Sequence, residues 1–252
     1  MGKRLHTIDS IRGITLLSMI LYHLCWDLVY IAGIQLDFYV KKPGFIWQQS
    51  ICWSFILISG FCVAISNHPI VRGLVVSLCG FIITAVTYFF LPEDIIIFGV
   101  LTFHGSAMII TGLLLPILEM IHPAVLLALS AFFFTITRNI SAGFIGFPGA
   151  NIITVPRSYY ANYFTTYLGF PFPSFYSTDY FALLPWIFLF WCGFALARLL
   201  RMPKKGTLLL KRPFYILIPG ISFIGKHSLI VYMLHQPILY ALVMLFVPGA
   251  AS

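Results

Sequence analysis

The residues best suited to chemistry lie in the first long apolar segment of the chain. Arg12 and His23 are eleven residues apart, close to three helical turns, so a helix would place both on one face. Asp9 lies three residues before Arg12, and Asp27 lies four residues after His23. We therefore expect a cation near one helix end and, about 16 Å further along, a histidine whose tautomer Asp27 sets.

Two further histidines lie within later apolar segments, His104 in FGVLTFHG and His235 in IVYMLHQP. The topology derived below predicts that both reach about the same membrane depth as His23. Pro237 should disturb its helix beside His235 and free a backbone carbonyl. No HxxH or HExxH spacing occurs, so we expect no metal site.

The composition is that of a membrane protein. Of 252 residues, 60% are hydrophobic and 9% are charged, whereas soluble domains carry roughly 25% charged residues. The net charge of +8 does not indicate nucleic-acid binding, because the cations lie mostly in short loops beside apolar runs. Ionisable side chains are costly in hydrocarbon, so those in the first segment favour a function.

The apolar runs predict an all-α polytopic membrane bundle with about seven transmembrane helices, in one domain over residues 1–252. The predicted spans are 11–31, 46–66, 70–91, 95–118, 123–140, 180–200 and 221–247. The distribution of Lys and Arg favours a cytoplasmic N-terminus. We expect the aromatic segment 141–179 to be an outer loop, either a lid or a loop lying on the headgroups, and 208–219 to be interfacial or re-entrant.

Four segments resemble the heparan-α-glucosaminide N-acetyltransferase catalytic-domain family, in particular its short bacterial members. They are IDSIRGITLLSMILYHLCWDL, FGVLTFHGSAMIITGLLLP, STDYFALLPWIFLFWCGFAL and GKHSLIVYMLHQPILY, and they occur in this order along almost the whole chain. Arg12 and His23 also reproduce the Arg-x10-His signature of the wider transmembrane acyltransferases.

The resemblance implies an enzyme of the bacterial cytoplasmic membrane. It would move an acyl group, usually acetyl, from cytoplasmic acyl-CoA to an amino or hydroxyl group of a sugar or envelope acceptor. An oligomer is compatible with the sequence. The catalytic residues expected are His23, Asp27, His104 and His235, and the residues expected to bind acetyl-CoA are Arg12, Asp9 and Lys226. A basic cluster would also attract CoA phosphates: Arg198, Arg201, Lys204, Lys205, Lys211 and Arg212.

Acyl transfer from a thioester needs a base for the incoming hydroxyl or amine, or a histidine that carries the acyl group. We expect His23 to fill one of these roles, with His104 or His235 assisting it or polarising the acyl carbonyl. One alternative is a proton-coupled transporter or channel with a histidine relay. The other is a scaffold in which Arg12 anchors the membrane edge and the remaining polar groups hold helices together.

Overall fold

A computed structural model describes residues 6–147, 149–200 and 218–247, and it confirms the all-α membrane bundle. Five helices are long and apolar enough to cross a membrane: α1 (His6–Tyr30), α3 (Lys42–Ala64), α4 (Pro69–Phe90), the segment Pro123–Ala142 that contains α7 (Pro123–Thr137), and α11 (Ser228–Phe246). Two apolar helices are shorter, α5 (Val100–Leu113) and α9 (Leu183–Leu199). All seven coincide with predicted spans, although the number that cross the bilayer and the cytoplasmic N-terminus stay predictions.

The chain divides into two compact units, 1–58 with 208–252, and 59–207. Because α3 continues across residue 58, its two ends belong to different units. The single domain expected over 1–252 therefore stays a prediction. The segment predicted to be interfacial, 208–219, lies almost wholly outside the described residues, as do all members of the basic cluster except Arg198.

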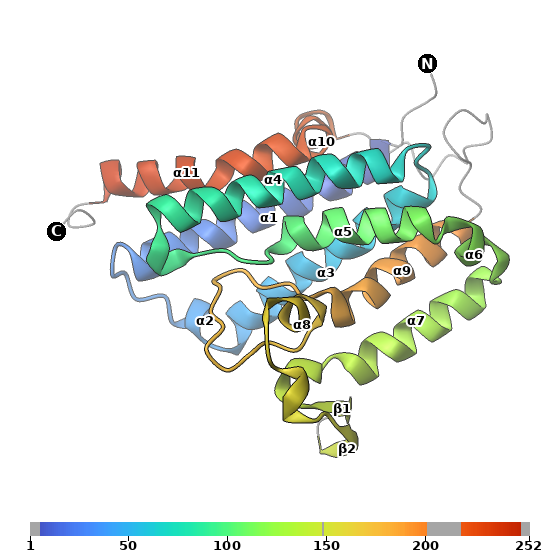
Figure 1. The fold of residues 1–252 in the computed structure, drawn as a ribbon. Coiled ribbons are helices and arrows are strands. Elements are labelled where there is room, and N and C mark those ends of the chain that lie inside the picture. Colours follow the sequence, from blue (N-terminus) through green and yellow to red (C-terminus); the bar gives the residue numbers. More distant parts are fainter. Residues whose placement is uncertain (1–5, 148, 201–217, 248–252) are drawn as a thin grey trace. The chain divides into compact units, whose positions relative to one another are not determined.

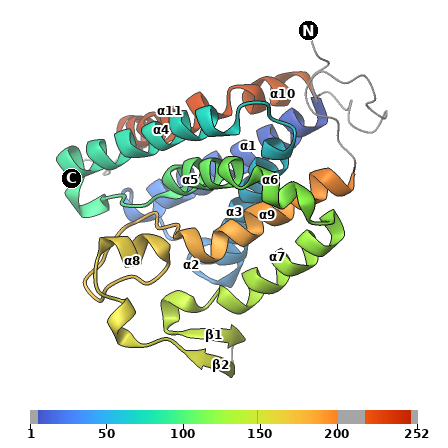
Figure 2. The same ribbon diagram turned by 45° about the vertical axis from the view of Figure 1, so that its right-hand side comes forward.

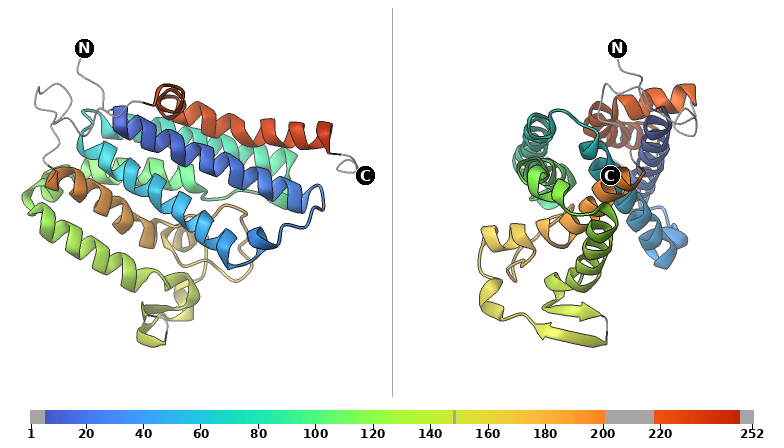
Figure 3. Two further views of the ribbon diagram at one scale, coloured as in Figure 1. Left: turned by 180° about the vertical axis from the view of Figure 1, so that it is seen from behind. Right: turned by 90° about the vertical axis from the view of Figure 1, so that its right-hand side faces the viewer.

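The first unit is built on α1, which contacts α10 (Pro219–Lys226) and α11 (Figure 3). It also contains the short helix α2 (Asp37–Val40). A Cβ atom at Gly225 would lie 1.8 Å from the carbonyl oxygen of Asp9, so only glycine permits this crossing of α1 and α10. Further along, Leu16, Met19 and Ile51 form a buried apolar core. The contacts of α1 with α11, His23 with His235 and then Asp27 with Gln236, advance in the same chain direction, so these two helices run parallel.

The second unit contains two helix pairs, α4 with α5 and α7 with α9, which Figure 1 shows side by side. It also contains the helical turns η1 (Pro92–Asp94) and α6 (Leu115–Met120). A Cβ atom at Gly105 of α5 would lie 2.6 Å from the backbone nitrogen of Ser77 in α4. This glycine therefore lets the two backbones approach closely, one residue after His104.

The segment expected to be an outer loop contains more regular structure than its sequence predicts. It holds η2 (Ile140–Ala142), an antiparallel hairpin of β1 (Phe144–Phe147) and β2 (Ala150–Thr154), η3 (Arg157–Tyr159) and α8 (Tyr163–Leu168). Figure 2 shows the hairpin beyond the end of α7, which β1 contacts. Residues 177–181 then pair with 94–100 through several hydrogen bonds, including Phe181 N–H to the Phe98 carbonyl at 2.9 Å.

Candidate active site

Two of the three histidines expected at one depth meet in the first unit. His23 of α1 and His235 of α11 have ring centroids 4.8 Å apart, in an edge-on arrangement of 66°. His23 is half-buried and His235 is 8% exposed. The parallel course of α1 and α11 brings them together, because residues at matching heights on parallel helices become neighbours.

The tautomer of His235 follows from its hydrogen bond. Its Nδ1 lies 2.5 Å from the carbonyl oxygen of Tyr232. A carbonyl oxygen only accepts, so Nδ1 of the imidazole carries the proton and donates it. In the neutral ring Nε2 then holds a lone pair, and this atom is buried without a hydrogen-bond partner among the described residues. His235 therefore has the electronic form of a general base.

The hydrogen bond of Asp27 differs from the prediction that this carboxylate sets the tautomer of His23. Its Oδ1 accepts a hydrogen bond of 2.7 Å from Nε2 of Gln236, and its described hydrogen bonds do not include one to His23. A four-residue spacing permits a contact along one helix, but here the carboxylate is directed to α11 instead. Asp27 is completely buried. Gln236 is not among the residues predicted from the sequence, although an amide next to His235 in an apolar segment is a usable signal.

Unsatisfied polar atoms concentrate around these residues, which we call the histidine centre: His23, Asp27, His235 and Gln236. Within the described ranges, four buried side-chain atoms have no hydrogen-bond partner, and three are Asp27 Oδ2, His235 Nε2 and Gln236 Oε1. The fourth is Oη of Tyr39. Most buried polar atoms in proteins are paired, so such a group of exceptions is typical of a site that receives a ligand. The described ranges hold no set of three His, Cys, Asp or Glu side chains suited to a metal ion.

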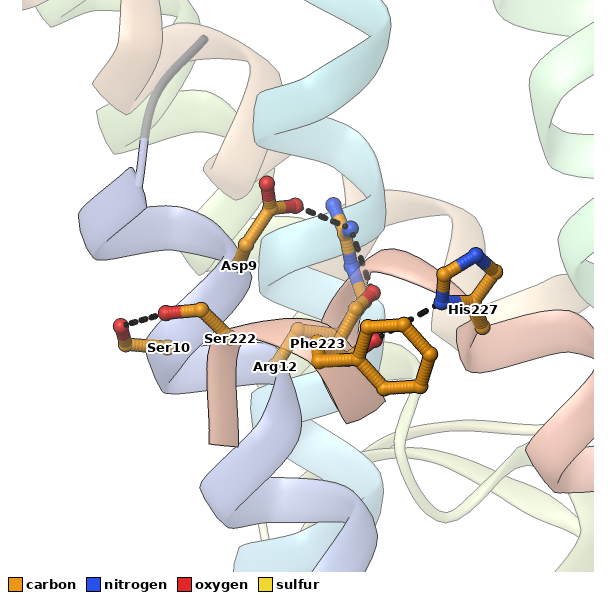
Figure 4. Close-up of polar contacts among 7 residues, drawn as sticks. Asp9, Ser10, Arg12, Ser222, Phe223 and His227 are labelled. Carbon is orange, nitrogen blue, oxygen red and sulfur yellow. Dashed lines mark hydrogen bonds and ion pairs between the residues drawn. The ribbon is translucent and has the colours of Figure 1, made fainter. Parts of the chain in front are cut away.

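Asp9 and Arg12, two of the residues expected to bind the acyl donor, lie where α1 crosses α10, and Figure 4 shows their contacts. The Nη1 atom of Arg12 donates to Asp9 Oδ1 at 3.1 Å and to the Gly225 carbonyl at 3.2 Å. The Ser10 and Ser222 hydroxyls are 2.5 Å apart. We call these five residues the α1–α10 junction. The Asp9–Arg12 pairing expected from their spacing is confirmed, and it ties the end of α10 to α1.

Lys226 follows Gly225 directly and is exposed at the end of α10. Next to it, His227 has Nδ1 3.0 Å from the Phe223 carbonyl, and its ring lies 4.5 Å from the Phe223 ring (Figure 4). Lys226 and Arg12 therefore lie at one end of the first unit. A role for Arg12, Asp9 and Lys226 in binding the donor stays a prediction.

His104 belongs to the second unit, so its assistance to His23 also stays a prediction. Its Nδ1 lies 2.7 Å from the Val100 carbonyl one turn earlier, which fixes its tautomer as in His235. The same turn of α5 is held by Asp179, whose Oδ2 accepts the Val100 N–H at 2.9 Å. Burial raises the pKa of Asp179 to about 6, and the Val100 hydrogen bond opposes that rise.

Arg198 is the described member of the basic cluster, and it has a structural partner. Its guanidinium donates to the carbonyls of Leu118, Glu119 and Ile121 at 2.7 to 3.0 Å. These carbonyls end α6, where a cation satisfies acceptors that the helix leaves unpaired. The contacts therefore favour a capping role for Arg198 over a role in binding phosphate.

Comparison with known protein families matches most of the chain to one catalytic domain. The catalytic-domain model of heparan-α-glucosaminide N-acetyltransferase matches residues 4–237. No curated protein and no solved structure matches the chain at a significant level. The matched region contains all the residues of the histidine centre and of the α1–α10 junction. The chain therefore belongs to the heparan-α-glucosaminide N-acetyltransferase catalytic family, and this membership implies the activity of a membrane acyltransferase.

Proposed function

We propose that this protein transfers an acetyl group from cytoplasmic acetyl-CoA to an amino or hydroxyl group of a sugar or envelope acceptor, in a bacterial cytoplasmic membrane. Family membership supports the class of reaction and the membrane setting. It also favours this function over the proton-coupled transporter. The reaction takes place at the histidine centre, where buried polar groups lie within the apolar helices α1 and α11.

His235 is the general base of the proposed reaction. Its Nδ1–H donates to the Tyr232 carbonyl, which leaves Nε2 as a proton acceptor inside the protein. The acceptor loses its N–H or O–H proton to this nitrogen as it attacks the thioester carbon. The carbon–sulfur bond breaks, and the departing thiolate of CoA takes up a proton. A positioned base contributes typically 10²–10⁴-fold to such a rate.

His23 gives the reaction a second route. Its ring lies beside His235 and is less buried, so its imidazole can itself attack the thioester. The acetyl group then forms an acyl-imidazole on His23 while CoA departs as the thiol. In the second step the acceptor attacks this acetyl group, His235 takes the acceptor's proton, and the bond from carbon to His23 breaks. The one-step route uses His235 alone as the base, whereas the two-step route also uses His23 to carry the acetyl group.

The α1–α10 junction supplies the cytoplasmic end of the proposed donor site. Lys226 is exposed there, and Arg12 lies beside the final turn of α10. Phosphates of CoA are favourable partners for such cations. His23 follows Arg12 by eleven residues, about 16 Å along a helix, so a donor with its phosphates near Arg12 would extend toward the histidine centre.

The observation that carries this proposal is the contact of His23 with a second histidine whose Nε2 is buried and unpaired. The test is acetyl transfer from labelled acetyl-CoA by purified protein in liposomes. His235→Gln should reduce turnover by about 10²–10⁴-fold on either route, and His23→Ala should reduce it comparably on the two-step route. The exposed His68, at the start of α4, provides the control His68→Gln, which should retain normal turnover.

Two results would reject the proposal. If His23→Ala and His235→Gln both transfer acetyl groups at the wild-type rate, the histidine centre is not the catalytic site. If the wild-type liposomes show proton-driven flux of a solute that needs no CoA, the transporter is the better account. Acetyl retained on His23 when no acceptor is present would select the two-step route.

A further inference from the structure

The three unpaired atoms of the histidine centre share one property, since each accepts hydrogen bonds. Nε2 of His235 is an acceptor because Nδ1 carries the proton. Oδ2 of Asp27 is likewise an acceptor when the carboxyl group is ionised. The amide of Gln236 is oriented by Asp27, because only Nε2 can donate to Oδ1, and Oε1 is left as an acceptor.

A ligand that satisfies these atoms must donate protons to them. An amine or hydroxyl can do so through its N–H or O–H bonds. A carbonyl or thioester oxygen cannot, because it would bring another acceptor against buried acceptors and leave all of them unpaired. These three atoms therefore do not stabilise the developing oxyanion of acyl transfer, and His235 in this tautomer does not polarise the acyl carbonyl.

From these contacts we propose that Gln236 determines specificity for the acyl acceptor. With Asp27 and His235 it forms the half of the active site that binds the attacking nucleophile, a group with two or more N–H or O–H donors. This inference rests on the proposed function and assigns the Asp27–Gln236 pair to the acceptor, not to the donor. Gln236 binds through Oε1 and also holds Asp27 so that Oδ2 is available to the same group.

If Gln236 binds the acceptor, its replacement should change the kinetic constants for the acceptor and leave the KM for acetyl-CoA unchanged. Loss of the amide removes one binding atom and the only described donor to Asp27, so it should affect the acceptor. The acyl donor, bound through other atoms, should keep its KM. A residue with only a structural role would instead lower the amount of active protein and leave both KM values unchanged.

The experiment uses the full-length protein in liposomes, with acetyl-CoA as donor and D-glucosamine or D-glucose as acceptor. These two sugars differ in one amino or hydroxyl group, so they show which nucleophile the site takes. In Gln236→Met, kcat/KM for the acceptor should fall about ten- to a hundredfold, while the KM for acetyl-CoA stays within about twofold. The exposed Gln48 of α3 supplies the matched control Gln48→Met, which should change neither constant.

Gln236→Glu provides a second variant with which to test the inference if Gln236→Met fails to fold. It retains an oxygen in place of Oε1, and the Glu–Asp pair can share one proton, so the acceptor defect should be smaller than in Gln236→Met. A raised KM for acetyl-CoA with unchanged acceptor constants, in either variant, overturns the inference, and so do unchanged constants in both. Wild-type protein that acetylates neither sugar contradicts the proposed function itself.

Discussion

The α1–α10 junction and the histidine centre are both clusters of residues that α1 forms with a later helix. They differ in whether their buried polar atoms have hydrogen-bond partners. At the junction, Arg12 donates to Asp9 and to the Gly225 carbonyl, and Ser10 meets Ser222. At the centre, Asp27, His235 and Gln236 each have one partner and one buried atom without a partner.

This difference separates two uses of polar residues in an apolar helix. Paired atoms hold helices together, since breaking them exposes buried groups without compensation. Unpaired acceptors give little stability and are available to a substrate. Changes at the junction should therefore reduce stability first, whereas changes at the centre should reduce catalysis first.

The largest effect on catalysis short of removing a histidine should come from Asp27→Asn. The variant keeps an oxygen for Nε2 of Gln236 and replaces the acceptor Oδ2 with a donor of the same size. Acetyl transfer should fall about 10²-fold, equivalent to about 2.7 kcal/mol of barrier, while the thermal midpoint changes little. Parallel assays of turnover and unfolding in detergent measure both. A lower thermal midpoint with normal specific activity would show that Asp27 stabilises the fold and does not act in catalysis.

The junction is most sensitive at Gly225. In Gly225→Ala the new Cβ would lie 1.8 Å from the Asp9 carbonyl oxygen, so α10 must move away from α1. Overpacking of this kind costs about 1–3 kcal/mol of unfolding free energy, measured by denaturation in detergent. Gly220→Ala is the matched control, because no described atom lies within 4 Å of its Cβ position. Equal stability of the two variants would show that α1 and α10 do not pack closely enough at Gly225 to exclude a methyl group.

Ser222→Ala should give a smaller loss at the same junction. It removes one partner of the buried Ser10 hydroxyl, and one such hydrogen bond contributes about 0.5–1.5 kcal/mol. Chemical denaturation of the variant beside wild type measures the difference. A decrease in the KM or kcat of acetyl transfer at unchanged stability would contradict the structural role of this pair.

The sequence predicted the junction better than the centre. The three-residue spacing of Asp9 and Arg12 lies within one helix, so helical geometry alone predicts their contact. The partner of Asp27 depends on which helix packs against α1, and one sequence does not contain this information. Tertiary packing directed Asp27 to Gln236, although its spacing from His23 fitted a contact. The β1–β2 hairpin was missed because its exposed apolar residues lack the alternation that indicates a strand.

A further predicted effect lies in the second unit and depends on pH. Because the folded pKa of Asp179 is about 6 and the ordinary value is 3.8, the folded state binds more protons between these values. Unfolding free energy should therefore decrease as pH rises from about 4 to about 6 and stay lower above that range. Asp179→Asn keeps an oxygen for the Val100 N–H, so it should raise the thermal midpoint at about pH 8 and lose this advantage near pH 4.

The matched control for that pH series is Asp37→Asn, at an exposed ion pair with Lys41. Exposed pairs contribute little to stability, so this variant should follow the wild-type curve. If Asp179→Asn also follows wild type at every pH, burial of the Asp179 carboxylate has no measurable cost.

The central claim is that the unpaired atoms of the histidine centre perform chemistry. Its most direct test is a paired measurement of acetyl transfer from acetyl-CoA and of thermal stability on His235→Gln. We predict a loss of turnover of about 10²–10⁴-fold with a midpoint close to that of wild type. Wild-type turnover in a normally folded His235→Gln protein would contradict the claim.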